Sequence, residues 1–269
     1  MPYGMYEGVM IMKGLSPTTT LALLMLIGGG HAHAQTAAEI VAATDGVRNP
    51  HQPFRSTVRF TEYRSGSERD HDSLIVYAKE DPATGQFRNL VQYSEPARDA
   101  GKRVLLDGGA LWFYDPASKT SVRISPQQRL IGQAAVGDVL TVNLKVDYNA
   151  SLVSTETIPD AEHAQRQCWH LELKAANDRA VYNRIEYWVE QNTFYPIKGK
   201  LYSDSGRLLK IVYFRNFGQR LGAVRPSEEV IIDAVDTALA TIATFSGDAF
   251  QDVPDVWFQR DYLPRLQTN

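Results

Sequence analysis

Cysteine is almost absent from the chain. The 269 residues contain a single cysteine, Cys168, so no disulfide can form within the chain. No cysteine stands directly after the N-terminal apolar segment, where we would expect the acceptor for a lipid anchor. Cys168 falls in a segment that alternates like a strand, apart from any evident base, and we expect its thiol to be unreactive.

Runs of like charge are also missing. The formal net charge is −3, and lysine and arginine are dispersed along the sequence. A mildly acidic chain without a basic run argues against nucleic-acid binding and against electrostatic attachment to a membrane.

Motifs for catalysis or metal binding are lacking as well. There is no G-x-S-x-G elbow and no glycine-rich phosphate loop after a strand. The cluster Arg69-Asp70-His71-Asp72 is better explained as a polar turn, because no second cluster has ligand spacing. Glu228 and Glu229 would point to opposite faces of a strand. We therefore expect a protein that is not an enzyme and has neither metal nor cofactor, although a site assembled from distant residues stays open.

The one long apolar run is too short to cross a membrane. Residues 21–27 read LALLMLI and precede the small-x-small sequence Ala32-His33-Ala34, which is typical of a signal peptide. We expect cleavage after Ala34, so that residues 1–34 are removed and residues 35–269 form a single exported domain. Lys13 is the nearest positive charge and follows Met12, which indicates translation from Met12. The expected location is the periplasm, with secretion as the alternative.

The remaining sequence alternates with period two. After an amphipathic helix over residues 35–47, apolar and polar side chains alternate in about ten segments separated by turns. This pattern predicts a mainly β protein built on one large, curved antiparallel sheet, an unclosed β-barrel with short helices as a lid.

A short helix is expected over residues 126–135. Ser125 can cap it, Pro126 suits its first position, Gln128 completes a capping box, and Gly137 ends it. Such a helix could close an ordinary core, or it could be a lid.

Few helices are available to cover the apolar face of so large a sheet. The sequence therefore predicts a partly open, apolar concavity of the kind that binds small hydrophobic ligands. Arg59, Arg88 and Gln92 should face away from it. The residues expected to contact the ligand are Val58, Phe60, Leu74, Val76, Phe87, Val91, Trp112, Tyr114, Leu130 and Ile131. The facing of Trp112 is open, because Leu111 and Phe113 are equally apolar.

One segment carries a family resemblance. Residues 107–116, D-G-G-A-L-W-F-Y-D-P, resemble the strand and turn of LolA, the periplasmic lipoprotein carrier. The pattern from Gln86 through Ser125-Pro126-Gln127-Gln128, with residues 202–207 and 258–264, is similar to the LolA-like outer membrane lipoprotein-sorting proteins. The resemblance implies an unclosed β-barrel that holds acyl chains under a helical lid. LolA has an arginine for cargo handover where this sequence has Glu80, so that mechanism is not implied.

Two functions follow as hypotheses. The first is a periplasmic carrier that takes lipoprotein acyl chains or another lipid from an inner-membrane transporter to an outer-membrane acceptor. The alternative is a non-enzymatic adaptor or sensor partner of an inner-membrane transporter. Lipid that co-purifies with the protein would favour the carrier.

Overall fold

The computed structural model describes residues 35–107 and 109–266. The chain divides into two units, Met1–Ala34 and Gln35–Asn269. The first unit coincides with the predicted signal peptide and lies outside the described residues. Cleavage after Ala34 and the single exported domain therefore stay predictions.

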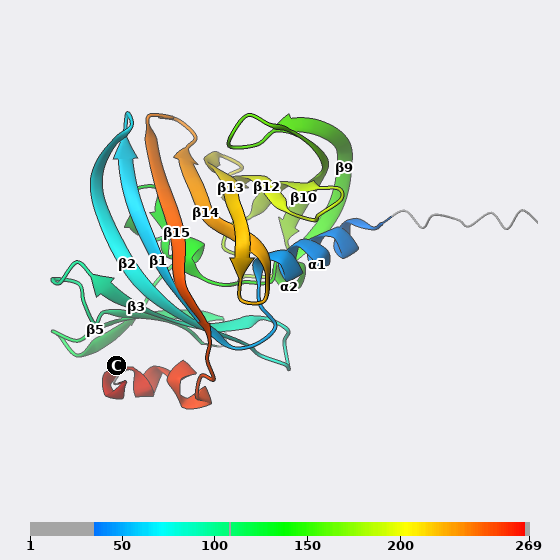
Figure 1. The fold of residues 1–269 in the computed structure, drawn as a ribbon. Coiled ribbons are helices and arrows are strands. Elements are labelled where there is room, and N and C mark those ends of the chain that lie inside the picture. Colours follow the sequence, from blue (N-terminus) through cyan, green and yellow to red (C-terminus); the bar gives the residue numbers. More distant parts are fainter. Residues whose placement is uncertain (1–34, 108, 267–269) are drawn as a thin grey trace, which may run out of the picture. The chain divides into compact units, whose positions relative to one another are not determined.

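Strands dominate the second unit (Figure 1). Thirteen of them form one antiparallel sheet whose two edge strands, β6 and β9, are not paired with each other, so the sheet is unclosed. The predicted mainly β fold is thus confirmed. The strands in spatial order are β6 (Thr120–Arg123), β5 (Ala110–Asp115), β4 (Arg103–Asp107), β3 (Phe87–Glu95), β2 (Ser67–Glu80), β1 (Phe54–Arg64), β15 (Leu239–Phe250), β14 (Ala223–Asp233), β13 (Leu208–Arg220), β12 (Pro196–Tyr202), β11 (Arg184–Glu190), β10 (Gln165–Ala175) and β9 (Tyr148–Pro159).

Short helices cover parts of the sheet. Helix α1 (Ala37–Arg48) begins with a capping box between Thr36 and Glu39 and packs on β9, β14 and α2 (Leu144–Asp147). One 3₁₀ turn, η1 (Val136–Val139), precedes α2, and two more, η2 (Asp255–Phe258) and η3 (Arg260–Arg265), end the described chain.

The predicted helix over residues 126–135 is wrong. This segment forms a small hairpin of β7 (Arg129–Ile131) and β8 (Ala134–Ala135). Its turn needs glycine at position 132, where φ is +53° and a Cβ atom would lie 2.3 Å from Thr241 Oγ1. The backbone N–H of Gln133 donates to the same hydroxyl at 2.8 Å. Contact with the sheet therefore outweighs the helix-start signals.

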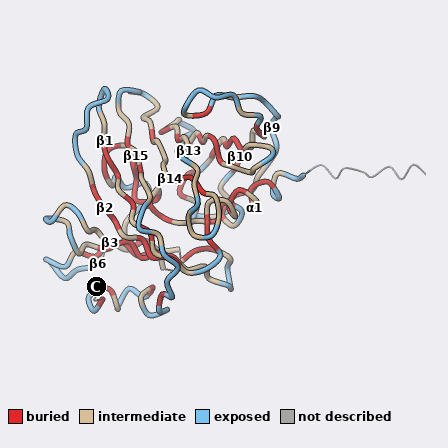
Figure 2. Tube along the Cα trace, viewed as in Figure 1, coloured by how far each residue is buried: buried red, intermediate tan, exposed pale blue. Residues whose placement is uncertain are grey.

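The two faces of the sheet have different covers. The inner face, defined by its contact with α1 and residues 131–144, carries the larger apolar core. The outer face packs against residues 253–266 through Tyr77, Leu90, Leu105 and Tyr114. In Figure 1 the C-terminal turns, in red, lie beside β3 and β5. Figure 2 shows buried stretches along β1, β2 and α1, while much of β9 is exposed.

Candidate ligand-binding cavity

A cavity of about 160 Å³ lies under the inner face. Strands from both halves of the sheet and the segment covering them contribute its wall. The apolar side chains of that wall include Val58, Val76, Val139, Leu140, Val142, Leu144, Ile185, Leu201, Val212, Phe214, Ile231 and Phe245. A concave, mainly apolar space with a few polar groups is typical of sites for small hydrophobic ligands.

A second cavity of about 230 Å³ lies on the other side of the covering segment. Phe87, Leu106 and Leu111 belong to its wall. Leu140 and Val142 line both cavities. Residues 136–147, which we call the strap, therefore form part of the partition between the two spaces.

The strap is held from one side by helix α1. The carboxylate of Asp45 accepts hydrogen bonds from the backbone N–H groups of Leu144 at 3.0 Å and Lys145 at 2.9 Å, and so caps the start of α2. Arg48 donates to the same carboxylate at 3.3 Å. Burial raises the pKa of Asp45, and Arg48 and the two N–H groups oppose that shift.

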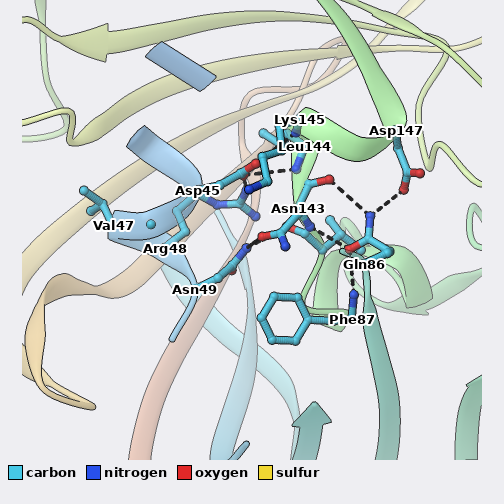
Figure 3. A network of polar contacts seen from close by, with 12 residues as sticks. Asp45, Val47, Arg48, Asn49, Gln86, Phe87, Asn143, Leu144, Lys145 and Asp147 are labelled. Carbon is cyan, nitrogen blue, oxygen red and sulfur yellow. Dashed lines mark hydrogen bonds and ion pairs between the residues drawn. The ribbon is translucent and has the colours of Figure 1, made fainter. Parts of the chain in front are cut away.

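From the other side, the strap is held by the buried side chain of Gln86 (Figure 3). Its Oε1 accepts from the N–H of Asn143 at 2.7 Å, and its Nε2 donates to the Asn143 carbonyl and to Asp147 Oδ2. Asn143 in turn donates to the Gly85 carbonyl and accepts from Asn49. A single amide thus ties the strap to the loop before β3.

Two further contacts complete the attachment. Asn89 of β3 accepts from the N–H of Thr141 and donates to its carbonyl, both at 2.9 Å. The carboxylate of Asp138 accepts hydrogen bonds from Lys210 Nζ at 2.7 Å and from the hydroxyl of Tyr182. The strap is therefore fixed by these polar bonds and also by the burial of Val136, Val139, Leu140 and Leu144 in the inner core.

One end of the first cavity is charged. Arg48, Tyr187 and Glu229 all line it, from α1, β11 and β14. Burial raises the pKa of Glu229 to about 7, against the opposing charge of Arg48. Burial also raises the pKa of Tyr187, whose hydroxyl lies near Thr44 without a hydrogen bond of normal geometry.

The ten predicted contact residues are divided among four locations: the two cavities, the rest of the inner core and the outer face. Val58 and Val76 line the first cavity and Phe87 the second. Leu130 packs against the inner core, whose buried members also include Phe60, Leu74, Val91 and Ile131. Whether any of them contacts lipid stays a prediction.

Trp112 and Tyr114 belong instead to the outer face, where they pack with the C-terminal turns. Leu111 and Phe113, their neighbours in β5, belong to the inner core. The expected facing of Trp112 and Tyr114 is therefore wrong. Four consecutive apolar residues carry no alternation, so only the packing of residues 253–266 selects which pair is outward.

Sequence reasoning missed most of the strap and the charged end. The apolar residues Val139, Leu140 and Val142 were a signal for a covering segment. In contrast, Asp45, Gln86 and Glu229 are isolated polar residues far apart in the chain. Nothing in their spacing indicates that they meet.

Across the described ranges, no cluster of three or more His, Cys, Asp or Glu side chains has the arrangement to hold a metal ion. Among those same residues, none of the helices combines the length and apolarity needed to cross a bilayer. Cys168 is buried, and burial raises the pKa of its thiol to about 12.

Comparison with known proteins agrees with the fold. A family model described as an uncharacterized protein matches residues 85–265, and no curated protein sequence matches the chain. Two solved structures are similar in fold: a DUF1329 family protein from Desulfovibrio piger (TM-score 0.71, 19% identity, 84% of this chain and 97% of that chain) and a domain named for outer membrane lipoprotein sorting from Vibrio parahaemolyticus (TM-score 0.70, 18% identity, 85% and 98%).

A third structure shares more of the sequence. The LolA superfamily protein from Nitrosomonas europaea has a TM-score of 0.75 and 31% sequence identity over 85% of this chain and 100% of that chain. This extent of identity confirms the resemblance seen in residues 107–116. The chain belongs to the LolA superfamily.

Proposed function

We propose that the protein is a periplasmic carrier that binds a lipid, or the acyl chains of a lipoprotein, under the inner face of its sheet. The observation that carries this proposal is the pair of mainly apolar cavities divided by the strap, a short segment that polar bonds and apolar packing hold against the sheet. Membership of the LolA superfamily supports the same role.

The energetics suit an apolar cargo. Each methylene group moved out of water contributes about 0.8 kcal/mol. The apolar walls of both cavities can gain this energy along a chain without forming any directional bond. Movement of the strap would join the two spaces, because Leu140 and Val142 stand between them.

Loading requires an open form of the strap. A ligand that fills the joined cavity binds only that form and shifts the population toward it. The strap bonds of Asp45, Gln86 and Asn89 set the cost of opening. Glu80, which stands where LolA has its handover arginine, lies at the end of β2, so the release step here would depend on other residues.

The proposed route runs between two membranes. An inner-membrane transporter would deliver the cargo and an outer-membrane acceptor would receive it, with the signal peptide placing the carrier between them. Both partners and the periplasmic location belong to the proposal.

The test starts with protein purified from the periplasm. Native mass spectrometry should detect bound lipid, and the delipidated protein should bind a fluorescent long-chain lipid. Val76→Asp puts a carboxylate into the cavity wall and should abolish that binding. Ile75→Asp on the same strand, which packs toward the outer face, is the matched control.

Thermal unfolding of both variants shows whether they fold. Val212→Phe, which fills the first cavity without adding charge, covers the case in which Val76→Asp does not fold. Absence of lipid, together with no binding of the added probe by wild type, would rule out the carrier.

A further inference from the structure

The charged end of the first cavity contains groups whose bonding is incomplete. Arg48 makes one hydrogen bond, from Nη1 to Asp45 at 3.3 Å, and no other from its guanidinium to a described residue is present. Asp45 is shared with two backbone N–H groups of the strap. Much of the hydrogen-bonding capacity of Arg48 is therefore unused inside the protein.

Glu229 has even fewer hydrogen-bond partners than Arg48. Its carboxyl group makes neither a hydrogen bond nor an ion pair with the residues that the structure describes. It lies on β14, opposite Ala243 of β15 and Phe214 of β13. Glu229 is half-buried and lines the cavity, so the accessible surface of its side chain is cavity wall. Buried carboxyl groups normally have partners, and the missing partner here would come from the cavity.

Neighbouring cations cannot supply that partner. Arg220 is bound to Asp248 through two nitrogens, at 2.7 and 3.0 Å. Arg225 donates to the carbonyls of residues 46, 47, 220 and 221. Lys210 is held by Asp138 and the Gln133 carbonyl. Arg48 and Glu229 are therefore the charged groups left to meet a ligand.

Hydroxyl groups add to the donors at this end. Tyr187 lies near Arg48 and Glu229, and its buried hydroxyl, beside Thr44, has no hydrogen bond of normal geometry. Ser56, whose hydroxyl is also buried without a partner among the described residues, lines the same cavity. The end of the cavity thus offers a guanidinium and the Tyr187 hydroxyl, while much of the remaining wall is apolar and its other charged groups, among them Asp138, Arg220 and Arg225, are already bonded within the protein. This arrangement is suited to an amphiphile with an acceptor-rich head group.

Building on the proposed carrier function, we propose that this end binds the singly charged oxyanion of an amphiphile, with the carboxylate or phosphate beside Arg48 and Glu229. Arg48 and the Tyr187 hydroxyl donate hydrogen bonds to the oxyanion. Glu229, in its protonated form, donates a third. The hydrocarbon tail extends along Val58, Val76 and Val212.

Other head groups fit less well. A cationic head group would meet Arg48 at close range, and a neutral alcohol would leave that guanidinium unpaired. Since hydrogen bonds to charged groups are the stronger ones, an acid should bind roughly tenfold tighter than the alcohol of equal chain length.

Binding should also depend on pH through Glu229. Its pKa of about 7 in the empty cavity means that it holds a proton at pH 6 and has lost it by pH 8. If only the protonated form accepts the oxyanion, affinity falls about tenfold over that interval. The titratable and charged groups that face Glu229 are Arg48 of α1, Asp138 of η1, Arg220 of β13, Tyr182 and Tyr187.

The experiment compares dodecanoate with dodecanol on the delipidated full protein by calorimetry at pH 6 and pH 8. Wild type should prefer dodecanoate at pH 6 and lose about tenfold in affinity for it at pH 8. Arg48→Gln should reduce dodecanoate binding about tenfold and leave dodecanol unchanged. Glu229→Gln, which stays neutral and keeps a donor, should bind dodecanoate with less than a roughly twofold change between the two pH values.

Two further variants serve as controls. Arg59→Gln removes an exposed arginine that pairs with Glu95 and should leave both ligands unaffected. Arg48→Lys keeps the positive charge and should retain most of the preference, which covers the case in which Arg48→Gln does not fold.

The outcomes separate this inference from the carrier function. Equal affinity for dodecanoate and dodecanol, unaffected by Arg48→Gln, overturns the oxyanion site and leaves the carrier intact. Absence of binding for both ligands overturns the carrier itself. Acetate binding as tight as that of dodecanoate would show a site for a free anion and overturn the amphiphile.

Discussion

Replacement of Gln86 by leucine should release the strap without unfolding the sheet. Leucine keeps most of the side-chain volume but removes the amide that bonds Asn143 N–H and Asp147 Oδ2. A buried N–H left without a partner costs about 1–3 kcal/mol, and a lost bond to a carboxylate about 1.5–3 kcal/mol. Allowing for relaxation, we expect about 3 kcal/mol, or an approximately 100-fold rise in the opening equilibrium.

Hydrogen exchange of backbone amides measures the opening of the strap directly. Peptides covering residues 139–147 should exchange about 100-fold faster in Gln86→Leu, because exchange follows the population of the open form. Peptides from β1, β2 and β15 should change little. Uptake of a fluorescent lipid should become faster, since the open form is more populated.

Gln167→Leu is the matched control. Gln167 is exposed on β10 and far from the strap, so its substitution should alter stability by less than about 0.5 kcal/mol. Equal acceleration of exchange in the strap and in the strands would mean that the strap is part of one cooperative core. That result, or unchanged exchange in the strap, would refute its role as a movable cover.

Three further predictions concern other parts of the molecule. Arg103→Met removes hydrogen bonds to the Leu263 and Leu266 carbonyls, so limited proteolysis should cut residues 253–266 faster than in wild type. Lipid uptake should be unchanged. A rate of cleavage equal to that of wild type would contradict the role of Arg103. The folded-state pKa of Glu229 is above its ordinary value, so its proton stabilises the fold fully below pH 4.5, and this contribution is lost as pH rises through about 7. The free energy of unfolding of Glu229→Gln, measured in urea, should therefore rise by about 3 kcal/mol relative to that of wild type from acidic to alkaline pH. A difference between the two proteins that does not change with pH would contradict the burial of Glu229. Cys168 should resist thiol reagents in the native protein and react after denaturation, whereas rapid native labelling would show that it is accessible.

Prediction from sequence worked best where burial repeats regularly. The alternation Val58, Phe60 and Leu74, Val76 places these side chains on one face, and the structure buries all four in the inner core. The antiparallel sheet, helix α1 and the C-terminal turns follow from such local patterns. Strand β9 was missed because most of its residues are exposed and show no alternation.

Predictions from local sequence signals were wrong where a tertiary contact was stronger. Ser125, Pro126 and Gln128 favour a helix, yet the segment from β7 to β8 approaches β15 so closely that Gly132 turns the chain into a hairpin against Thr241. Likewise, the facing of Trp112 was decided by the C-terminal turns on the outer face.

By itself, the sequence determined the mainly β sheet, its apolar inner face and the family, because side-chain period and a contiguous motif are local properties. Only the tertiary structure decided where the cavities lie, what closes them and which polar groups face inward. Asp45 meets Leu144, Gln86 meets Asn143, and Arg48 shares a cavity with Glu229. These pairs are far apart along the chain, and the folding of the strap and α1 onto the sheet brings them together.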